Sequence, residues 1–274
     1  MVTVNMFFRK KNEKKQIGIK NIKNTDTENS IIAFDHVNLY DDENQPVFRN
    51  LSFSINQGEK VFILGHTDKE RTLILHAIMG LLKNFEGEIK VFGQNISSLN
   101  QLNMLDFRKN IGYAFPQKGI LRNISISENI SLPLRFNGNL SEKQILKRTL
   151  RILELFDLKE IQQKKAWQLD NFVQKKTTLA RAIIHNPAIL LIDEPTTYLE
   201  ENDIVLIKAL IDKIFTSEYL SSKTIVIIAS EDEEWAVKNT NKILCVQKGE
   251  QVFYGDIKYF NKFIRKIGRD NLQI

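Results

Sequence analysis

Two adjacent carboxylates follow an apolar run in the second half of the chain. Asp193 and Glu194 come directly after the run Leu-Leu-Ile at 190–192, which is typical of a strand buried on both faces. Carboxylates at the carboxyl ends of parallel strands lie where open α/β sheets bind ligands. An aspartate there can hold a magnesium ion, and a glutamate can polarise an attacking water molecule. The alternative is that the pair only orders the end of the strand.

A second candidate for chemistry is the loop that follows an earlier strand. Residues 60–64 are apolar after Lys60, and apolar residues recur at helical spacing from Thr72 to Gly80. We therefore expect a strand, a loop over 65–71 and a helix in succession. This succession is the context that a phosphate-binding loop requires.

Other patterns predict the elements that must position these residues. Apolar runs over 31–39 and 47–55 flank turn-forming residues and indicate a β-hairpin, and 224–230 is a further buried strand. The segment from about 119 to 185 is mostly helical, with amphipathic periodicity over 143–158 and 176–184.

Composition is that of an ordinary globular protein. Of the 274 residues 42% are apolar and 26% charged, and no apolar stretch approaches the roughly 18 residues of a membrane span. The single Cys245 excludes a disulfide-rich secreted module and indicates a reducing compartment. The four histidines lack metal-ligand spacing, so a zinc site is not expected.

The basic character belongs to the two ends of the chain. Residues 1–30 hold seven Lys/Arg against three Asp/Glu, and residues 256–274 hold five against two, within a net charge of +6. We expect a poorly ordered basic leader over 1–30 without a secretory signal, and a basic tail over 256–274. Both ends are either solvated or in contact with anionic lipid or an acidic partner. The residues between them, 31–255, are not expected to bind nucleic acid.

The segment Leu-Leu-Ile-Asp-Glu-Pro-Thr at 190–196 resembles the Walker B segment of the ATP-binding-cassette (ABC) ATPases. The family's other landmarks recur around it in order. They are Phe34-Asp35-His36-Val37 before Tyr40, Gly58-Glu59-Lys60, Gly87-Glu88-Ile89 with Gly93, Ile111-Gly112-Tyr113-Ala114-Phe115, Leu179-Ala180-Arg181-Ala182 and Asn186-Pro187. The resemblance covers residues 31–255. It implies the α/β fold of a P-loop NTPase, with a parallel core sheet, an antiparallel β subdomain and a helical subdomain, or arm, at about 119–185.

The resemblance also implies a site for ATP with magnesium. Thr72 and Asp193 would hold the metal, Glu194 would be catalytic, and Tyr40 would stack on adenine unless it is only a turn aromatic. The remaining nucleotide-binding positions are Gly65, His66, Thr67, Asp68, Lys69, Glu70 and Arg71.

The phosphate loop departs from the family pattern G-x-x-G-x-G-K-[ST]. Only Gly65 and Thr72 are kept, while Asp68 and Glu70 replace glycines and add carboxylates where phosphate would lie. Arg71 replaces the lysine and either meets phosphate or pairs with a neighbouring carboxylate.

Other motifs also depart at the positions that carry chemistry. A proline replaces the glutamine that senses magnesium, the signature L-S-G-G-Q is lost, and a glutamate replaces the switch histidine. These degenerate positions are Pro116, Gln117, Leu169, Asp170, Asn171, Phe172, Val173 and Glu231. The doublet Lys175-Lys176 is interpreted as a solvated helix start.

Two functions remain open. The chain is either a working ATP-hydrolysing subunit or a pseudo-ATPase kept for docking and shape. The resemblance implies transmembrane permease subunits as partners, a homodimer or a heterodimer with another ABC ATPase subunit, and a peripheral position on the cytoplasmic face of the cytoplasmic membrane. Residues 65–67 and 131–134 look most like the branches for lipid or lipoprotein transport and cell division.

Overall fold

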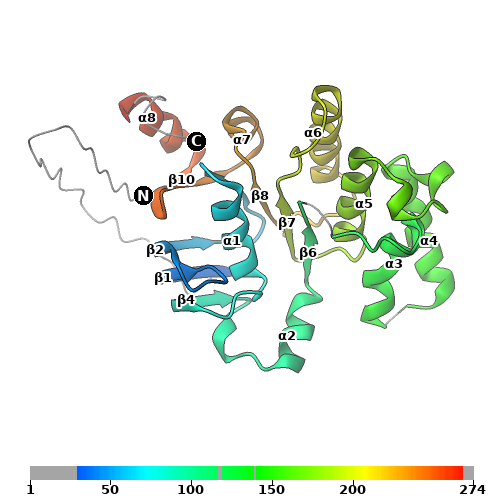
Figure 1. Ribbon diagram of the computed structural model, residues 1–274, viewed down its shortest axis with the longest axis horizontal. Coiled ribbons are helices and arrows are strands. Elements are labelled where there is room, and N and C mark those ends of the chain that lie inside the picture. Colours follow the sequence, from blue (N-terminus) through cyan, green and yellow to red (C-terminus); the bar gives the residue numbers. More distant parts are fainter. Residues whose placement is uncertain (1–29, 117–118, 139, 268–274) are drawn as a thin grey trace, which may run out of the picture. The chain divides into compact units, whose positions relative to one another are not determined.

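The structure is a computed structural model that describes residues 30–116, 119–138 and 140–267. The chain divides into two compact units, which are described one at a time. The first comprises residues 30–99 and 229–267, and the second residues 100–228 (Figure 1). Nearly all of the predicted leader therefore lies outside the described residues.

The first unit contains a four-stranded antiparallel sheet. Its strands are β1 (Ile32–Tyr40), β2 (Pro46–Ile55), β4 (Phe85–Val91) and β5 (Gln94–Asn95). Their order is β2-β1-β4-β5, and the predicted hairpin of β1 and β2 is confirmed. The rings of Phe34 and Phe53 stack in the core with centroids 4.4 Å apart.

Three more strands complete the sheets of the first unit. They are β3 (Lys60–Gly65), β9 (Lys242–Gln247) and β10 (Glu250–Asp256), in the order β10-β9-β3. Strands β3 and β9 are parallel, while β9 and β10 are antiparallel. Cys245 is completely buried in β9, and this burial raises the pKa of its thiol to about 12.

Helix α1 (Asp68–Ile78) follows β3 and corrects the predicted loop. The helix begins at Asp68, four residues before the expected Thr72. Thr67 caps it, because its side chain accepts a hydrogen bond from the Glu70 amide. Residues 68–71 lack the glycines that would favour left-handed turns, and acidic residues in a first turn are stabilised by the helix dipole.

Two other helices of the first unit pack on its strands. They are α7 (Glu233–Asn239) and α8 (Ile257–Ile267). The Trp235 ring of α7 meets Phe62 of β3 edge-on at 5.2 Å between centroids. Phe260 and Phe263 of α8 are buried against Phe253 of β10. The part of the predicted tail that forms α8 is therefore a helix with one packed, aromatic face.

The described part of the second unit contains three strands and five α-helices, two of which lie outside 119–185. The strands are β6 (Ile111–Ala114), β7 (Ile189–Asp193) and β8 (Ile225–Ala229), in the order β8-β7-β6. Strands β6 and β7 are parallel, and the two helices outside 119–185 are α2 (Gln101–Arg108) and α6 (Glu201–Phe215). Among the described residues, none of the helices has the length and apolar character to cross a membrane.

The helices within 119–185 are α3 (Ile126–Asn137), α4 (Glu142–Leu155) and α5 (Asn171–Ile183). Helix α3 packs against both α4 and α5 (Figure 1). The side chains of Ser141 and Gln144 form a capping box at the start of α4. Short 3-10 turns occur at Ile96–Ser98, Lys159–Ile161 and Ala166–Gln168.

Candidate functional site

Arg71 closes the short loop between β3 and α1. Its side chain is only 2% exposed, and its guanidinium donates a hydrogen bond to the backbone carbonyl of Gly65 at the start of the loop. A Cβ atom added at Gly65 would lie 3.4 Å from the Arg71 side chain. The positive group that the resemblance assigns to phosphate therefore contacts the loop's own backbone.

The other charged side chains of the loop are also engaged within the first unit. A Glu70 carboxylate oxygen accepts a hydrogen bond from the Gly249 amide at 2.9 Å. Lys69 pairs with Asp41 at 2.8 Å, and this contact raises the pKa of Lys69 and lowers that of Asp41. Asp68 is exposed and lies at the amino end of α1. Negative charge therefore occupies the helix end that a phosphate would approach.

Three other predicted residues lie in the first unit near this loop. Tyr40 is half-buried at the end of β1, and its hydrogen bond to Glu86 raises the pKa of its phenol. His66 is exposed in the loop, and Thr72 is half-buried within α1. The roles of these residues toward a nucleotide and a metal stay predictions.

In the second unit, the carboxylates of Asp193 and Glu194 are buried, with exposed fractions of 1% and 4%. The hydroxyl of Tyr113 in β6 donates to Asp193 at 2.6 Å, and burial together with this carboxylate raises the Tyr113 pKa. Thr197 donates to the Glu194 carboxylate at 3.3 Å. Both acids are therefore hydrogen-bonded inside their own unit.

Lys175 is a functional candidate that the sequence interpretation missed. It is only 6% exposed, and its ammonium donates to the backbone carbonyl of Glu194. Desolvation lowers its pKa to about 8, against the opposing effect of Asp193 and Glu194. The interpretation of Lys175-Lys176 as a solvated helix start is wrong, because α5 begins earlier and both side chains are buried.

A periodic signal for Lys175 was present in the sequence. Lys175, Leu179 and Ala182 recur at helical spacing, which puts the lysine on the same face as apolar residues. Lys176 is also buried, and its ammonium lies over the Phe172 ring and donates to the Asp157 carbonyl at 3.4 Å.

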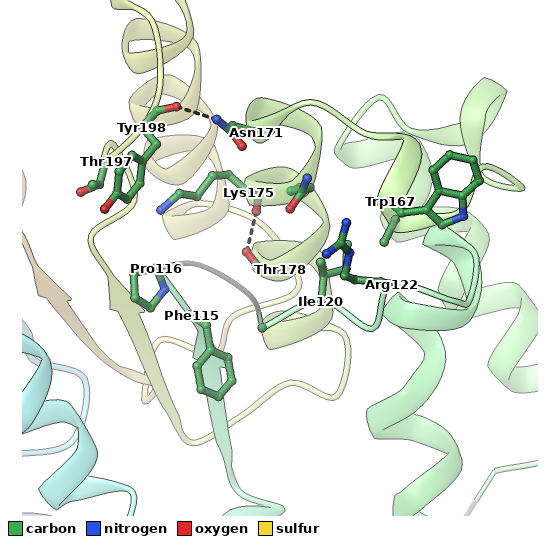
Figure 2. Close-up of a pocket in the computed structure, with 13 residues that line it drawn as sticks. Phe115, Pro116, Ile120, Arg122, Trp167, Asn171, Lys175, Thr178, Thr197 and Tyr198 are labelled. Carbon is green, nitrogen blue, oxygen red and sulfur yellow. Dashed lines mark hydrogen bonds between the residues drawn. The ribbon is translucent and has the colours of Figure 1, made fainter. Parts of the chain in front are cut away.

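The degenerate signature forms the start of α5. Asp170 caps the helix by accepting from the Val173 amide at 2.8 Å, and Leu169 before it is buried. The side-chain amide of Asn171 donates to the Tyr198 backbone carbonyl at 3.1 Å (Figure 2). The helix end that would face phosphate in the family thus carries a carboxylate of its own.

A cavity of about 380 Å³ lies within the second unit (Figure 2). Aromatic and apolar residues line it, among them Phe115, Pro116 and Trp167. Arg122 and Lys175 supply positive charge, and no described lining residue is acidic. Pro116 therefore borders a cavity, while Gln117 lies outside the described residues.

The predicted switch position belongs to the first unit. Glu231 is exposed and precedes α7, whose capping residue Asp232 accepts from the Trp235 amide at 2.8 Å. Within 30–116, 119–138 and 140–267, no group of three or more His, Cys, Asp or Glu side chains is arranged to hold a metal ion.

The strand orders and the two carboxylates at the end of β7 agree with the fold of an ABC-type P-loop ATPase. The chain belongs to the ABC transporter family, whose model matches residues 48–197. The predicted family and fold class are confirmed.

Curated relatives and a solved structure agree with this assignment. The methionine import ATP-binding protein MetN of Clostridioides difficile (strain 630) is 30% identical over 85% of this chain and 74% of its own length. The lipoprotein-releasing system ATP-binding protein LolD 1 of Chlorobium chlorochromatii (strain CaD3) is 28% identical over 73% and 80%. The dimeric structure of MJ0796, a bacterial ABC transporter cassette, has a TM-score of 0.73 and 27% identity over 82% and 98%.

Proposed function

We propose that the chain is an ABC transporter subunit of the ATP-binding type whose own ATPase site is impaired, and which docks on a membrane permease complex. The observation that carries this proposal is the closed loop between β3 and α1. Arg71 is buried against the Gly65 carbonyl, and the helix already begins at Asp68.

The backbone of the loop supports the same conclusion. A phosphate loop binds its ligand through successive backbone N–H groups that point into the loop. Here the Glu70 amide donates to the Thr67 side chain, and the Arg71 amide donates to the Thr67 carbonyl at 3.3 Å. These donors are used inside α1, so ATP binding would require the first turn of the helix to open.

The metal ligands that the resemblance implies do not fit magnesium well. A magnesium ion needs freely available oxygen ligands in near-octahedral geometry. Asp193 instead accepts a short hydrogen bond from Tyr113 and lies in a buried environment. We therefore propose that ATP and magnesium are bound weakly or not at all by this chain.

Docking on a permease would use the helices within 119–185. The resemblance implies this role for the arm, and of the helices in the arm α5 lines the cavity beside Pro116, whose described lining residues include no acid. Such docking would hold the protein at the cytoplasmic face of the cytoplasmic membrane. The substrate class stays open between lipoprotein-type transport and import of a small solute, because the relatives include LolD and MetN.

The second candidate function is that of a working ATP-hydrolysing subunit. The observation that favours it is the position of Asp193 and Glu194 at the end of β7, where this family has its catalytic carboxylates. In that case the chain would form a homodimer or a heterodimer with an intact ABC ATPase subunit.

ATP hydrolysis by Glu194→Gln tests the proposal. We expect the wild-type rate to equal that of Glu194→Gln, both for the purified chain and for the complex that co-purifies with it from its native membrane. The pairwise comparison removes any contribution of an active partner subunit. A wild-type rate about tenfold or more above the variant would contradict the proposal and support the working subunit.

A further inference from the structure

We infer that a clamp from outside the loop holds the first turn of α1 closed, and that release of this clamp controls whether the first unit binds an anion. The clamp consists of two contacts made by consecutive residues of α1. Glu70 binds the turn between β9 and β10, and Lys69 binds the turn between β1 and β2. The inference rests on the proposed function and deepens it, because it says what keeps the loop of the impaired site closed.

Gly249 is the fixed point of the clamp. Its amide donates to the Glu70 carboxylate at 2.9 Å, and its carbonyl accepts from the Arg49 amide of β2 at 3.0 Å. The other oxygen of the Glu70 carboxylate is buried and has no hydrogen-bond partner among the described residues. The charge-assisted hydrogen bond from Gly249 is therefore the contact that holds this carboxylate, and it joins α1 to both sheets of the first unit.

The turn that carries Gly249 is positioned without help from α1. Lys248 and Gly249 have φ values of 52° and 75°, as the two central residues of a tight hairpin turn require. A Cβ atom added at Gly249 would lie only 2.3 Å from the carbonyl oxygen of Val47. The turn therefore approaches β2 closely at a position that only glycine fits, and it offers Glu70 a fixed amide.

The second contact of the clamp is the weaker one. The Asp41 carboxylate accepts from the amides of Glu43 and Gln45 at 3.1 and 2.8 Å, so its own turn orients it toward Lys69. However, the Lys69 side chain is 64% exposed. An ion pair with so exposed a partner contributes little and is screened by salt, so the Glu70 contact carries most of the clamp.

The clamp determines which backbone donors the loop can offer. While the turn is closed, the amides of Glu70 and Arg71 donate to Thr67. An anion of the phosphate type needs such amides for itself, so it can bind only those chains in which the clamp is open. Its apparent affinity is then reduced by the fraction of open chains.

Amide hydrogen exchange of the full chain without nucleotide tests the clamp, with the rates of single amides measured by NMR. In Glu70→Ala we expect the amides of Arg71 and Gly249 to exchange about tenfold or more faster than in the wild type, because each loses protection when the shared contact is removed. Glu70→Gln keeps an acceptor oxygen, so its amides should exchange more slowly than those of Glu70→Ala.

Asp68→Ala is the matched control, because Asp68 is an exposed acid of the same helical turn. It removes the same charge and introduces the same residue, and it should change either exchange rate less than about fivefold. An unchanged rate at Gly249 in Glu70→Ala, or equal acceleration in the two variants, would overturn the inference. If Glu70→Ala does not fold, Glu70→Gln is compared with Asp68→Asn by the same criteria.

Inorganic tripolyphosphate is the probe for the anion. Both alanine variants lose one negative charge, but only Glu70→Ala loses the clamp. Calorimetric titration should therefore show about tenfold tighter binding to Glu70→Ala than to Asp68→Ala. Equal affinities, or no binding to either variant, would overturn the link between the clamp and the anion.

The clamp and the proposed function can fail separately. The comparison of wild-type ATP hydrolysis with Glu194→Gln decides the proposed function. Exchange at Arg71 and Gly249 is measured without nucleotide, so it decides the clamp whatever the ATPase comparison shows.

Discussion

At the scale of single residues, His185 is a half-buried ionisable group of the second unit. Its Nδ1 atom is buried and has no hydrogen-bond partner in the described part of the chain. Burial lowers its pKa to about 4, although a backbone hydrogen bond with Ile111 opposes this shift. The folded protein therefore keeps this imidazole neutral at pH values where an unfolded chain would protonate it.

His185 makes stability depend on pH in a defined direction. With an unfolded pKa near 6.5 and a folded pKa of about 4, the unfolded state binds more protons between these values. Stability is thus lost as pH falls from about 6.5 toward 4, by up to about 2–3 kcal/mol. We expect His185→Gln to flatten this slope in denaturant titrations at several pH values. The exposed His66→Gln serves as control, and an equal slope in both variants would contradict the assignment.

The residues of the site were predictable to different extents. Asp193 and Glu194 were predicted because a local signal, an apolar run that ends in two acids, marks the end of a buried strand. Lys175 was missed because its hydrogen-bond acceptor, the backbone carbonyl of Glu194, lies in a later part of the sequence. Charged residues are usually exposed, and the helical spacing of Lys175 with Leu179 and Ala182 was a signal that this one is an exception.

At the scale of elements, the start of α1 is the feature that most affects ligand binding. We expect the pair Asp68→Gly and Glu70→Gly to strengthen magnesium-ATP binding, because it removes two negative charges and lets the loop take left-handed angles. The same change should lower stability by about 1–2 kcal/mol, since glycine is unfavourable in a helix. Calorimetric titration and denaturant unfolding measure the two effects.

The first turn of α4 offers the matched control for this pair. Glu142→Gly with Lys143→Gly should reduce stability by a similar amount without changing nucleotide binding. Tight magnesium-ATP binding by the unaltered protein would contradict the closed loop and the argument drawn from it.

The elements themselves were predicted better than their boundaries. Strands β3, β7 and β8 were found because buried strands appear as continuous apolar runs. The predicted start of α1 was wrong because it was placed where the apolar periodicity begins, whereas Thr67 and the acidic residues after it are local signals for an earlier helix start.

At the scale of the whole molecule, the basic residues near the end of the chain lie on the exposed face of one helix. Helix α8 buries its aromatic face and exposes four basic side chains. These are Lys258, Lys262, Arg265 and Lys266. A helix whose apolar face is already packed can attract an anionic membrane only through charge.

We expect replacement of these four residues by glutamine to reduce co-sedimentation with vesicles that contain anionic phosphatidylglycerol. Each basic group near such a surface contributes about 1 kcal/mol, and salt screens this attraction. The same replacement of four exposed basic residues of α4, at 143, 147, 148 and 151, is the control. Equal loss in both variants, or binding that ignores salt, would contradict a specific role for α8.

The buried thiol of β9 is an intrinsic reporter of when this strand becomes exposed to solvent. Cys245 is the only cysteine of the sequence, and a thiol that is fully enclosed with a raised pKa reacts slowly with alkylating reagents. Alkylation requires that β9 becomes exposed, so the labelling rate measures local unfolding of the first unit. A ligand or partner that binds this unit would slow the labelling, and one that binds only the second unit would act on it solely through coupling between the two.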